Sequence, residues 1–257
     1  MADFDGLVAV VAGGSTGIGD AVVDRLAGDG ARIVFCGHEA AGVAATQDRT
    51  GATGMVADVR SAPQMSALIE HAVDLHGGLD ILVNAAGIQR YGTVEDTTEE
   101  AWNEVLDVNL KGMFLTGKYA VPHLRARGGG SIVNVSSVQA YATQDHVLGY
   151  SISKAGINAL TRSMALDHAA DGIRVNAVCP GSVDTPMLRA SAEQFKGEDT
   201  AEETVVKWGR THPLGRVARP AEVAEVVAFL AGPRSSFVTG SEYRVDGGLL
   251  NRLAATL

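Results

Sequence analysis

The sequence has few cysteines, few aromatic residues and no long apolar run. Its two cysteines, Cys36 and Cys179, both stand in apolar stretches, as reduced, buried thiols in a reducing compartment do. No apolar stretch approaches the roughly 20 residues that a membrane-spanning helix needs. Residues 1–5 also lack the basic start of a signal peptide. We therefore predict a cytoplasmic protein.

Positive charge is also in short supply. The 21 lysines and arginines are outnumbered by 30 acidic residues, which gives a formal net charge of −9. This balance argues against nucleic acid or an anionic membrane as a partner. Apolar residues make up 46% of the chain and charged residues 20%, which is typical of a globular protein. We predict a single domain over residues 1–257.

Short, nearly continuous apolar runs alternate with longer amphipathic segments. The runs predict seven buried parallel strands at residues 7–12, 31–36, 54–57, 79–84, 130–136, 173–179 and 242–245. The segments between them predict helices at residues 17–29, 39–49, 61–76, 98–125, 147–169 and 220–231. The alternation predicts an α/β fold with a doubly wound, Rossmann-type parallel sheet and helices on both faces. The helix at 98–125 should bend, because Gly112 and Gly117 lie within it.

Residues 187–215 interrupt this alternation. They are rich in charge and carry a lone tryptophan, Trp208. We predict that they form a small helical substrate lid over the carboxyl edge of the sheet, inserted within the single domain. Met187, Leu188 and Trp208 would then line a substrate pocket.

A glycine-rich loop joins the first predicted strand to the helix behind it. Glycines in the pattern G-x-x-x-G-x-G would let the backbone turn sharply and approach a pyrophosphate, with the helix N-terminus facing the phosphates. The spacing differs from the commoner fingerprint G-x-G-x-x-G. We predict that a dinucleotide is bound here by Gly13, Ser15, Thr16, Gly17, Ile18 and Gly19.

Residues after the second and third predicted strands bear on which dinucleotide binds. An acidic residue after the second strand would bind the ribose of NAD, and a nearby arginine would accept the extra phosphate of NADP. The sequence has Gly37 and His38 there. The lack of a fixed cation favours NAD, although a protonated His38 would assist NADP. Asp58, which precedes Val59, would bind the adenine amino group or cap the helix that starts near Ser61.

Small residues follow the fourth and sixth predicted strands, where a cofactor and the backbone can lie close together. Asn84 would also brace neighbouring strands, and the backbone of Val183 and the hydroxyl of Thr185 would hold the nicotinamide carboxamide. The predicted cofactor contacts at these two strand ends are Asn84, Ala85, Ala86, Gly87, Pro180, Gly181, Val183 and Thr185.

Tyr150 and Lys154 stand four residues apart at the start of a predicted helix, so their side chains project from one face. A free tyrosine has a pKa near 10, and a neighbouring ammonium would lower it, so that Tyr150 could exchange a proton with a substrate oxygen. Lys154 would also hold the nicotinamide ribose. Ser137, at the end of the fifth strand, would stabilise the substrate oxygen, whereas the alternative, Ser136, points to the other face. Asn109 would hold a water that connects Lys154 to solvent.

Polar side chains near these residues indicate a hydroxylated substrate such as a sugar, polyol or hydroxy acid, although they would equally suit an exposed loop. The predicted substrate contacts are Gln89, Ser137, Gln139, Gln144, His146, Tyr150, Met187, Leu188 and Trp208. No metal site is predicted, because no second ligand stands at a fitting spacing from His146.

Taken together, these residues resemble the short-chain dehydrogenase/reductase family in its compact, single-domain form. The resemblance covers nearly the whole chain and depends on the order and spacing of the glycine loop, Asp58, Asn84-Ala85-Ala86-Gly87, Asn109, Ser137, Tyr150, Lys154 and Pro180-Gly181. It implies four catalytic residues: Tyr150 as general acid/base, Lys154 as its pKa partner and ribose ligand, Ser137 as ligand of the substrate oxygen, and Asn109 in a proton relay. It also implies a homotetramer built largely from the helices that contain Asn109 and Tyr150 and from the C-terminal strand region.

The resemblance implies an NAD(P)-dependent oxidoreductase that acts on small-molecule secondary alcohols or ketones. Within this class, a dehydrogenase of small polar alcohols competes with a 3-oxoacyl-[acyl-carrier-protein] reductase. The net charge of −9 disfavours an acidic carrier protein, although Arg125 and Arg127 could form a local basic patch. A non-catalytic nicotinamide-binding regulator would not need Ser137, Tyr150 and Lys154 together. A sugar-nucleotide epimerase or dehydratase would need a separate substrate domain, for which the chain has no room.

Overall fold

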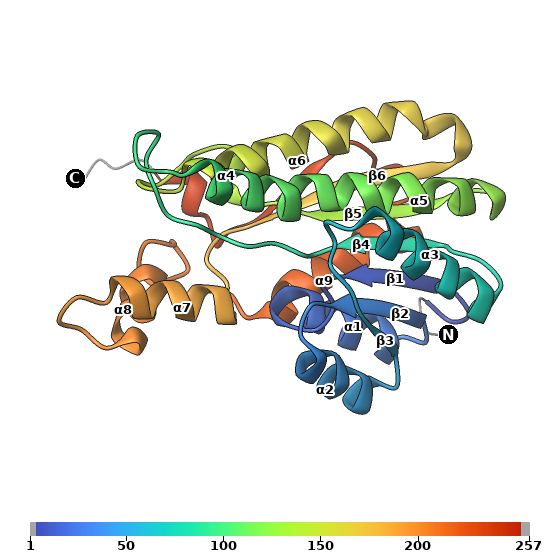
Figure 1. The fold of residues 1–257 in the computed structure, drawn as a ribbon, viewed down its shortest axis with the longest axis horizontal. Helices are drawn as coiled ribbons and strands as arrows, with labels where there is room; N and C mark the ends of the chain where they lie inside the picture. The colour runs from blue at the N-terminus through green and yellow to red at the C-terminus, as the bar shows by residue number, and fades with distance from the viewer. Residues whose placement is uncertain (1–3, 253–257) are drawn as a thin grey trace.

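A seven-stranded parallel sheet forms the centre of the computed structural model, which describes residues 4–252 (Figure 1). The strand order is β3-β2-β1-β4-β5-β6-β7, and every neighbouring pair is parallel. The strands are β1 (Val8–Ala12), β2 (Arg32–Gly37), β3 (Thr53–Val56), β4 (Ile81–Asn84), β5 (Gly130–Val135), β6 (Ile173–Pro180) and β7 (Glu242–Val245). The predicted single-domain, Rossmann-type fold is confirmed. The two ends of the predicted domain lie outside the described residues.

Helices cover both faces of the sheet. The helices are α1 (Gly17–Gly28), α2 (Ala40–Thr50), α3 (Ala62–His76), α4 (Glu99–Leu106), α5 (Gly112–Ala126), α6 (Leu148–Asp167), α7 (Pro186–Phe195), α8 (Ala201–Gly209) and α9 (Pro220–Ala231). Helices α1, α2 and α9 share one hydrophobic cluster with the strands, and α3, α5 and α6 share the other. None of the helices within residues 4–252 has the length and apolarity that crossing a bilayer demands.

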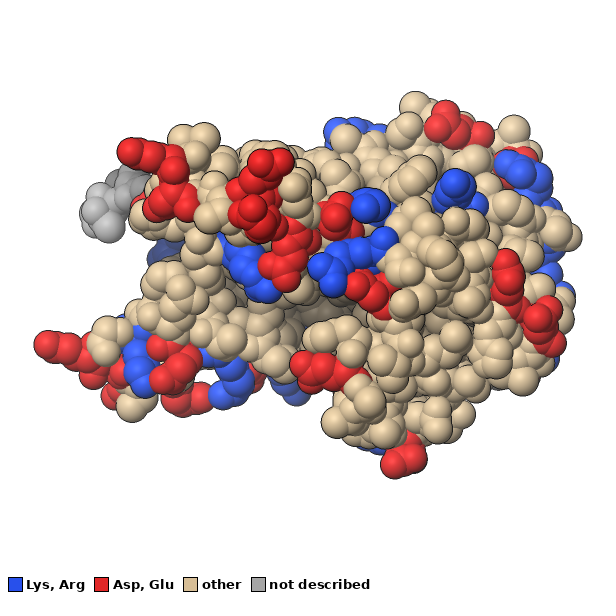
Figure 2. Space-filling model, viewed as in Figure 1, with Lys and Arg blue, Asp and Glu red and all other residues tan. Residues whose placement is uncertain are grey.

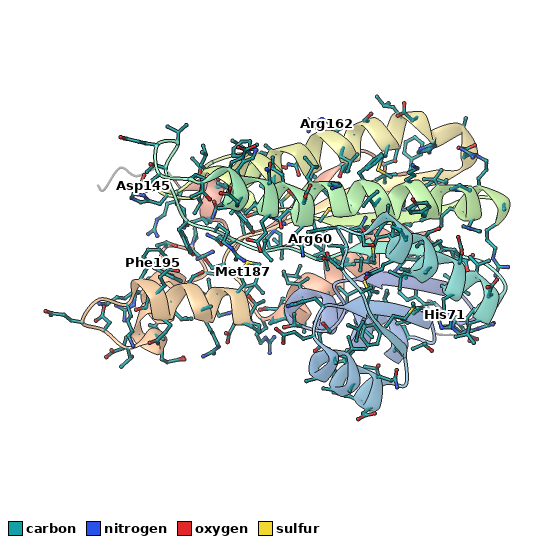
Figure 3. All side chains as sticks on the ribbon, viewed as in Figure 1. Arg60, His71, Asp145, Arg162, Met187 and Phe195 are labelled. Carbon is teal, nitrogen blue, oxygen red and sulfur yellow. The ribbon has the colours of Figure 1, made fainter. Side chains whose placement is uncertain are left out.

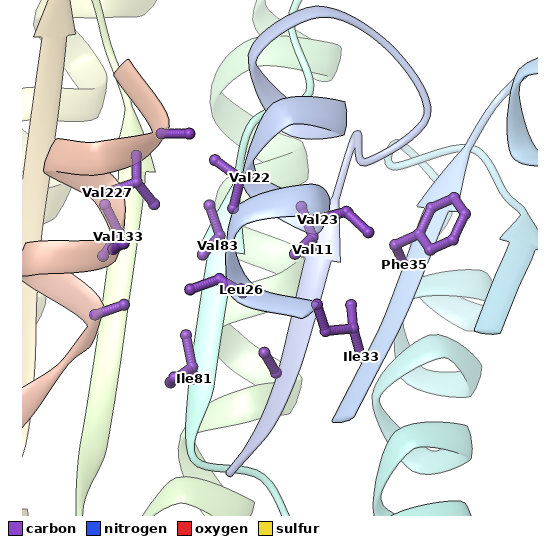
Figure 4. Close-up of a cluster of buried hydrophobic side chains, with 14 of the residues drawn as sticks. Val11, Val22, Val23, Leu26, Ile33, Phe35, Ile81, Val83, Val133 and Val227 are labelled. Atoms are coloured by element: carbon purple, nitrogen blue, oxygen red, sulfur yellow. The ribbon is translucent and has the colours of Figure 1, made fainter. Parts of the chain in front are cut away.

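Side chains alternate along β1 between these two clusters. Val11 faces Val22 and Leu26 of α1, and all three are fully buried (Figure 4). Val10 faces the opposite cluster, which includes Leu68 of α3. Burial on both faces explains why the strands read as continuous apolar runs. Because all the strands run in one direction, the loops after β1, β4, β5 and β6 meet at one edge of the sheet.

The helix predicted at 98–125 is interrupted, but ahead of the glycines to which we assigned the bend. A π-helical turn at Asp107–Lys111 joins α4 to α5, and it contains Asn109. Gly112 begins α5, and Gly117 lies inside it without a break. The wider turn presents the Asn109 amide to both backbone polar groups of Ile88. This contact spans 21 residues, so the glycine content of the helix does not reveal it.

Residues 187–215, which we call the lid segment, form a helical unit at the carboxyl edge of the sheet, and its helices α7 and α8 project from the main body (Figure 1). The hydroxyl of Thr185 caps α7, and Thr200 and Glu203 form a reciprocal capping box at the start of α8. Figure 2 shows acidic and basic side chains intermingled on this unit. Two helices therefore account for the charge-rich segment that breaks the strand–helix alternation.

Candidate active site

The glycine loop lies where β1 ends and α1 begins, and it is closely packed. A Cβ atom on Gly13, whose φ is +82°, would lie 2.5 Å from the backbone nitrogen of Ala86. A Cβ atom on Gly19 would lie 2.0 Å from the carbonyl oxygen of Gly13. Real Cβ atoms do not approach backbone so closely, so both positions require glycine. The loop is therefore held against the loop that follows β4.

The open end of α1 offers unpaired backbone donors. The first hydrogen bond in this helix runs from the N–H of Asp20 to the carbonyl of Thr16, at 3.2 Å. The N–H groups of Gly17, Ile18 and Gly19 precede that bond. Such donors, together with the positive end of the helix dipole, suit an anionic phosphate. The loop thus fits the pyrophosphate of a dinucleotide.

The turn after β6 lies beside this loop. A Cβ atom on Gly17 would lie 3.2 Å from Cγ2 of Thr185. The Thr185 hydroxyl, which we predicted to bind a carboxamide, accepts the N–H of Leu188 and donates to the carbonyl of Val183, both at 3.3 Å. In the structure, this hydroxyl therefore stabilises the turn after β6 and caps the N-terminus of α7.

A chain of buried polar side chains crosses the sheet beneath the site. Thr116 of α5 donates to Asn84 Oδ1 at 2.6 Å, and Asn84 donates to Asn134 Oδ1 at 2.9 Å. Asn134 in turn donates to the hydroxyl of Thr161 on α6, also at 2.9 Å. Asn84 therefore braces β4 against β5, and the chain ties together the two helices that flank the site.

Lys154 lies against Tyr150 and is buried, with 4% of its surface exposed. Its Nζ lies 5.3 Å from the centre of the Tyr150 ring and donates to the carbonyl of Val135 at 3.0 Å. Burial lowers the pKa of Lys154 to about 8 and raises the pKa of Tyr150 to about 12. We predicted that the ammonium would lower the pKa of Tyr150, but burial dominates in the structure.

The two serines at the end of β5 have different partners. Ser137 is buried; its Oγ accepts the N–H of Gln139 at 3.1 Å, and its hydrogen bond to Tyr150 partly offsets the rise in the pKa of that phenol. Ser136 donates to the backbone carbonyl of Lys154 at 3.1 Å. Ser137 thus stands with Tyr150 at the predicted reaction site, whereas Ser136 anchors the helix that carries Lys154.

Asn109 is fully buried, and each of its polar atoms has a protein partner. Oδ1 accepts the N–H of Ile88 at 2.8 Å, and Nδ2 donates to the carbonyl of Ile88 at 2.9 Å and to Ser153 Oγ at 3.0 Å. Asn109 Oδ1 and Lys154 Nζ flank Gly87, at 3.5 and 3.6 Å from the place of its missing Cβ. Asn109 therefore fixes the loop after β4 beside Lys154, and its part in a water relay stays a prediction.

Space is lacking beside Gly37, the position predicted to select the coenzyme. A Cβ atom there would lie 2.0 Å from Oγ of Ser15 in the glycine loop. The next side chain, His38, is 74% exposed, and its Nε2 lies 3.3 Å from the carboxylate of Glu39. The loop serine thus occupies the place that an acidic side chain at position 37 would need.

Asp58 bonds to its near neighbour Arg60. Its carboxylate accepts the backbone N–H of Arg60 at 2.9 Å and forms an ion pair with the guanidinium at 2.7 Å, and these contacts lower the pKa of Asp58. Ser61 occupies the N-cap of α3. The alternative that Asp58 caps this helix is therefore wrong, because its carboxylate is committed to Arg60. Val59 is buried against Gly112.

The loop after β4 also holds the lid segment, through a residue that the sequence did not suggest. Tyr91 donates from its hydroxyl to Ser191 Oγ of α7 at 2.6 Å. Its ring meets that of Phe195 edge-on, with centroids 4.5 Å apart. A charge on Tyr91 would raise the pKa of Tyr150, so the two phenols are neighbours. Figure 3 shows Met187 and Phe195 on the lid helix toward the main body. In the sequence, only its position two residues after Gln89 connected Tyr91 with the predicted substrate pocket.

The predicted substrate residues divide into two groups. Gln89, Met187, Leu188 and Trp208 are partly buried, and Gln139 is held by Ser151, which donates to its Oε1 at 3.1 Å. Gln144 and His146 are exposed, on the loop whose Asp145 lies at the end of the main body in Figure 3. The carbonyl of His146 accepts the N–H of Gly92 at 2.7 Å, so this loop is tied to the one that carries Gln89 and Tyr91.

Two further expectations concern cysteine and metal. Cys36 and Cys179 are free and fully buried thiols, as predicted. Within residues 4–252, no three His, Cys, Asp or Glu side chains gather in a way that would hold a metal ion.

The comparisons with known proteins point to one family. Residues 12–250 match a family model described as enoyl-(acyl carrier protein) reductase. The chain is 41% identical to cis-4-hydroxycyclohexanecarboxylate dehydrogenase of Sinomonas cyclohexanicum, over 94% of this chain and 95% of that protein. It is 37% identical to a putative ketoacyl reductase of Streptomyces coelicolor, over 98% and 100% of the two chains.

A solved structure agrees with these matches. Ligand-free aldohexose dehydrogenase of Thermoplasma acidophilum superposes with a TM-score of 0.93 at 37% identity, covering 99% of this chain and 98% of that one. The matches extend over the whole sheet and the lid segment. The protein is therefore a member of the short-chain dehydrogenase/reductase family.

Proposed function

We propose that the protein is an NAD(P)-dependent oxidoreductase that interconverts a secondary alcohol and a ketone. The observation that carries this proposal is the meeting of the glycine loop with Ser137, Tyr150 and Lys154 at one edge of the sheet. The bound nicotinamide coenzyme supplies or accepts the hydride. Matches to dehydrogenases and reductases over nearly the full chain support the same reaction class.

The protein's own residues handle the proton of this reaction. In oxidation, Tyr150 Oη takes the hydroxyl proton of the alcohol while the substrate carbon loses hydride, and in reduction both transfers reverse. Ser137 donates to the substrate oxygen and stabilises its charge. The Lys154 ammonium, protonated below pH about 8, binds the ribose, and its positive charge beside the Tyr150 ring opposes the effect of burial on the pKa of that phenol. Asn109 keeps the loop after β4 in place beside this lysine.

For the coenzyme we propose NAD over NADP. Two side chains near the end of β2 that would pair with a phosphate already face carboxylates, because His38 lies beside Glu39 and Arg60 is bonded to Asp58. A 2′-phosphate would have to compete with these carboxylates, whereas ribose hydroxyls would not. The remaining predicted contacts, from Asn84 to Gly87 and from Pro180 to Thr185, surround the nicotinamide half in this proposal.

Fluorescence titration of the pure protein with NADH and with NADPH tests both parts of this proposal. We expect NADH to bind about tenfold more tightly, with little change in the His38→Ala variant, a difference of about 1.4 kcal/mol. Tighter binding of NADPH that His38→Ala weakens would reverse the coenzyme assignment. If neither nucleotide binds at micromolar protein and coenzyme concentrations, the proposed reaction is wrong.

We propose a small, hydroxylated substrate, such as a sugar, polyol or hydroxy acid. Support comes from two hydroxyls beside Tyr150, those of Ser137 and Tyr91, and from the partly buried amides of Gln89 and Gln139 on the loops after β4 and β5. The lid segment would cover this substrate through Met187, Leu188 and Trp208. A screen of such alcohols with NAD, followed by absorbance at the wavelength of NADH, checks the assignment. Activity confined to long apolar alcohols would contradict it.

A second candidate activity, reduction of 3-oxoacyl groups on acyl carrier protein, is favoured by the family model and by the ketoacyl reductase relative. The predicted basic patch does not support it. Arg125 is paired with Asp171 and Arg127 with Asp80, and both pairs lie at the amino ends of the strands, opposite the site. Assays with 3-oxoacyl thioesters of the carrier and of a small thiol separate the two activities.

We also propose that the chain forms a homotetramer in the cytoplasm. Exposed apolar side chains lie on the two helices for which the family resemblance implies this role, with Phe114 of α5 at 49%, Ile152 of α6 at 41% and Leu166 of α6 at 81%. Light scattering during gel filtration measures the mass directly. A mass of 26.6 kDa, that of one chain, would contradict the proposal.

A further inference from the structure

A buried histidine connects the lid segment to the turn after β6. His212 follows α8 and is only 3% exposed. Its Nε2 accepts the backbone N–H of Ser182 at 3.1 Å, and its Nδ1 lies 3.2 Å from the carbonyl of Trp208. A nitrogen that accepts a hydrogen bond cannot carry a proton, so these partners assign the neutral tautomer with the proton on Nδ1.

The imidazole fills a space that two glycines leave open. A Cβ atom on Gly181 would lie 2.8 Å from Nε2 of His212, and one on Gly247 would lie 3.4 Å from its Cβ. Gly181 donates to the carbonyl of Val245 at 3.0 Å, so the turns after β6 and β7 are joined around the ring. The ring is therefore wedged between two strand ends and the last turn of α8.

We propose that His212 is a positioning residue, which sets the turn Gly181–Val183 for the nicotinamide half of the coenzyme. The proposal rests on the function proposed above, in which this turn binds the coenzyme. His212 contacts no reacting atom; it acts through the Ser182 N–H. Because its other nitrogen binds the Trp208 carbonyl, a displacement of the lid segment is transmitted through one ring to the turn.

The turn has room to move once the imidazole is removed. A cavity of about 80 Å³ lies beside the ring, and its lining includes Ser182, His212 and Asp246. Alanine at position 212 would enlarge this cavity and leave the Ser182 N–H without its acceptor. Glutamine would place its Oε1 at about the same reach as Nε2 and restore the acceptor, but not the bond to Trp208.

The test compares His212→Ala with His212→Gln, and uses His71→Ala on α3, at the far end of the body in Figure 3, as a matched control. In His212→Ala, we expect hydrogen exchange of the segment 181–185 to become about tenfold faster and the Kd of the reduced coenzyme to rise about tenfold, the usual cost of an unsatisfied buried donor. His212→Gln should bring the exchange rate and the Kd most of the way back to the wild-type values, and His71→Ala should change neither quantity. Equal losses in the alanine and glutamine variants would overturn the proposal, because the acceptor would then not matter.

Imidazole nitrogen NMR of the wild-type protein provides a test that does not depend on the folding of any variant. We expect a neutral His212 with its proton on Nδ1 at pH 7, and a proton on Nε2 would refute the contact to Ser182. The hydrogen exchange of residues 181–185 and the tautomer of His212 are both measured in the absence of coenzyme. If the wild type binds neither NADH nor NADPH, the proposed function fails, while these two measurements still decide whether His212 holds the turn.

Discussion

Different kinds of contact stabilise the body of the protein and its lid segment. Ser137, Lys154 and Asn109 are buried, and each is bonded to a backbone group, Ser137 within its own turn and the other two on a neighbouring strand or loop. In the lid segment, exposed Arg189 pairs with Asp184 at 2.6 Å and with Glu202 at 3.1 Å. Buried hydrogen bonds to the backbone fix geometry, whereas exposed ion pairs contribute little and weaken with salt.

In the proposed function, this difference would separate the reaction from the choice of substrate. The proposed proton exchange requires Tyr150 to be held within hydrogen-bond reach of the substrate oxygen, and buried contacts would provide that precision. The lid segment contacts the body through Tyr91, which meets Ser191 and Phe195, and through His212, which accepts the N–H of Ser182. Relatives whose names give different substrates match nearly the whole of this chain, the lid segment included, so the overall fold does not by itself identify a substrate.

The largest effect is expected from Tyr150→Phe. This change removes the hydroxyl that we propose exchanges the proton and leaves the ring in place, so kcat should fall about 10³-fold, within the range for a lost general acid/base. The Kd of the coenzyme should change less than about threefold, because phenyl fills the same space. Steady-state rates and fluorescence titration measure the two quantities, with Tyr119→Phe on α5 as the control. A variant that keeps most of its rate would exclude Tyr150 as the acid/base.

Lys154→Met tests the cost of burying the ammonium. The pKa of Lys154 is about 8 when folded, below its ordinary value of 10.5. Between these values the unfolded chain keeps a proton that the folded chain has lost, so the stability of the wild type should rise with pH. Relative to Lys154→Met, its free energy of unfolding should increase by about 2 kcal/mol from pH 7 to pH 9.5. Urea denaturation measures this change.

Lys118→Met, at an exposed position on α5, is the control for the lysine experiment and should show no such rise. A stability difference between wild type and Lys154→Met that stays flat with pH would mean that burial does not perturb Lys154. Below pH about 8 both states are protonated, and the difference should level off.

The smallest effects are expected in the lid segment. Tyr91→Phe removes the hydrogen bond to Ser191 but keeps the edge contact with Phe195, so the substrate KM should rise about fivefold with kcat nearly unchanged, as for one lost neutral hydrogen bond. Arg189→Gln breaks exposed ion pairs and should change KM less than about twofold. A larger effect from Arg189→Gln would show that charge, and not the Tyr91 contact, holds the lid.

Much of the fold follows from the sequence, because the local apolar patterns agree with the parallel sheet that the chain forms. The apolar runs predicted every strand to within two residues, since a parallel strand buried on both faces requires such a run. The carboxyl edge then brings together Gly13, Asn84, Ser137 and Gly181 without further information. The π-helical turn around Asn109 escaped prediction, because it depends on a contact with Ile88.

The contacts that escaped prediction are those between segments far apart in the chain. Tyr91 meets Ser191 across 100 residues, and His212 meets Ser182 across 30. Neither residue type is unusual in its local sequence, so no spacing rule singles them out. The Asp58 capping alternative failed for a different reason, since a nearer partner, Arg60, offered a charged bond in place of a neutral one.

The contact between Ser15 and Gly37 imposes an order on mutation. Any side chain at position 37 would collide with Ser15, whose Oγ and Cβ would lie 2.0 and 2.5 Å from the new Cβ atom. Gly37→Asp by itself should therefore damage the loop. Ser15→Gly would remove the two shortest of these contacts and leave Cγ2 of Val43, at 3.1 Å, as the next. Positions 15 and 37 are thus epistatic, because the side chain at one limits what the other can hold.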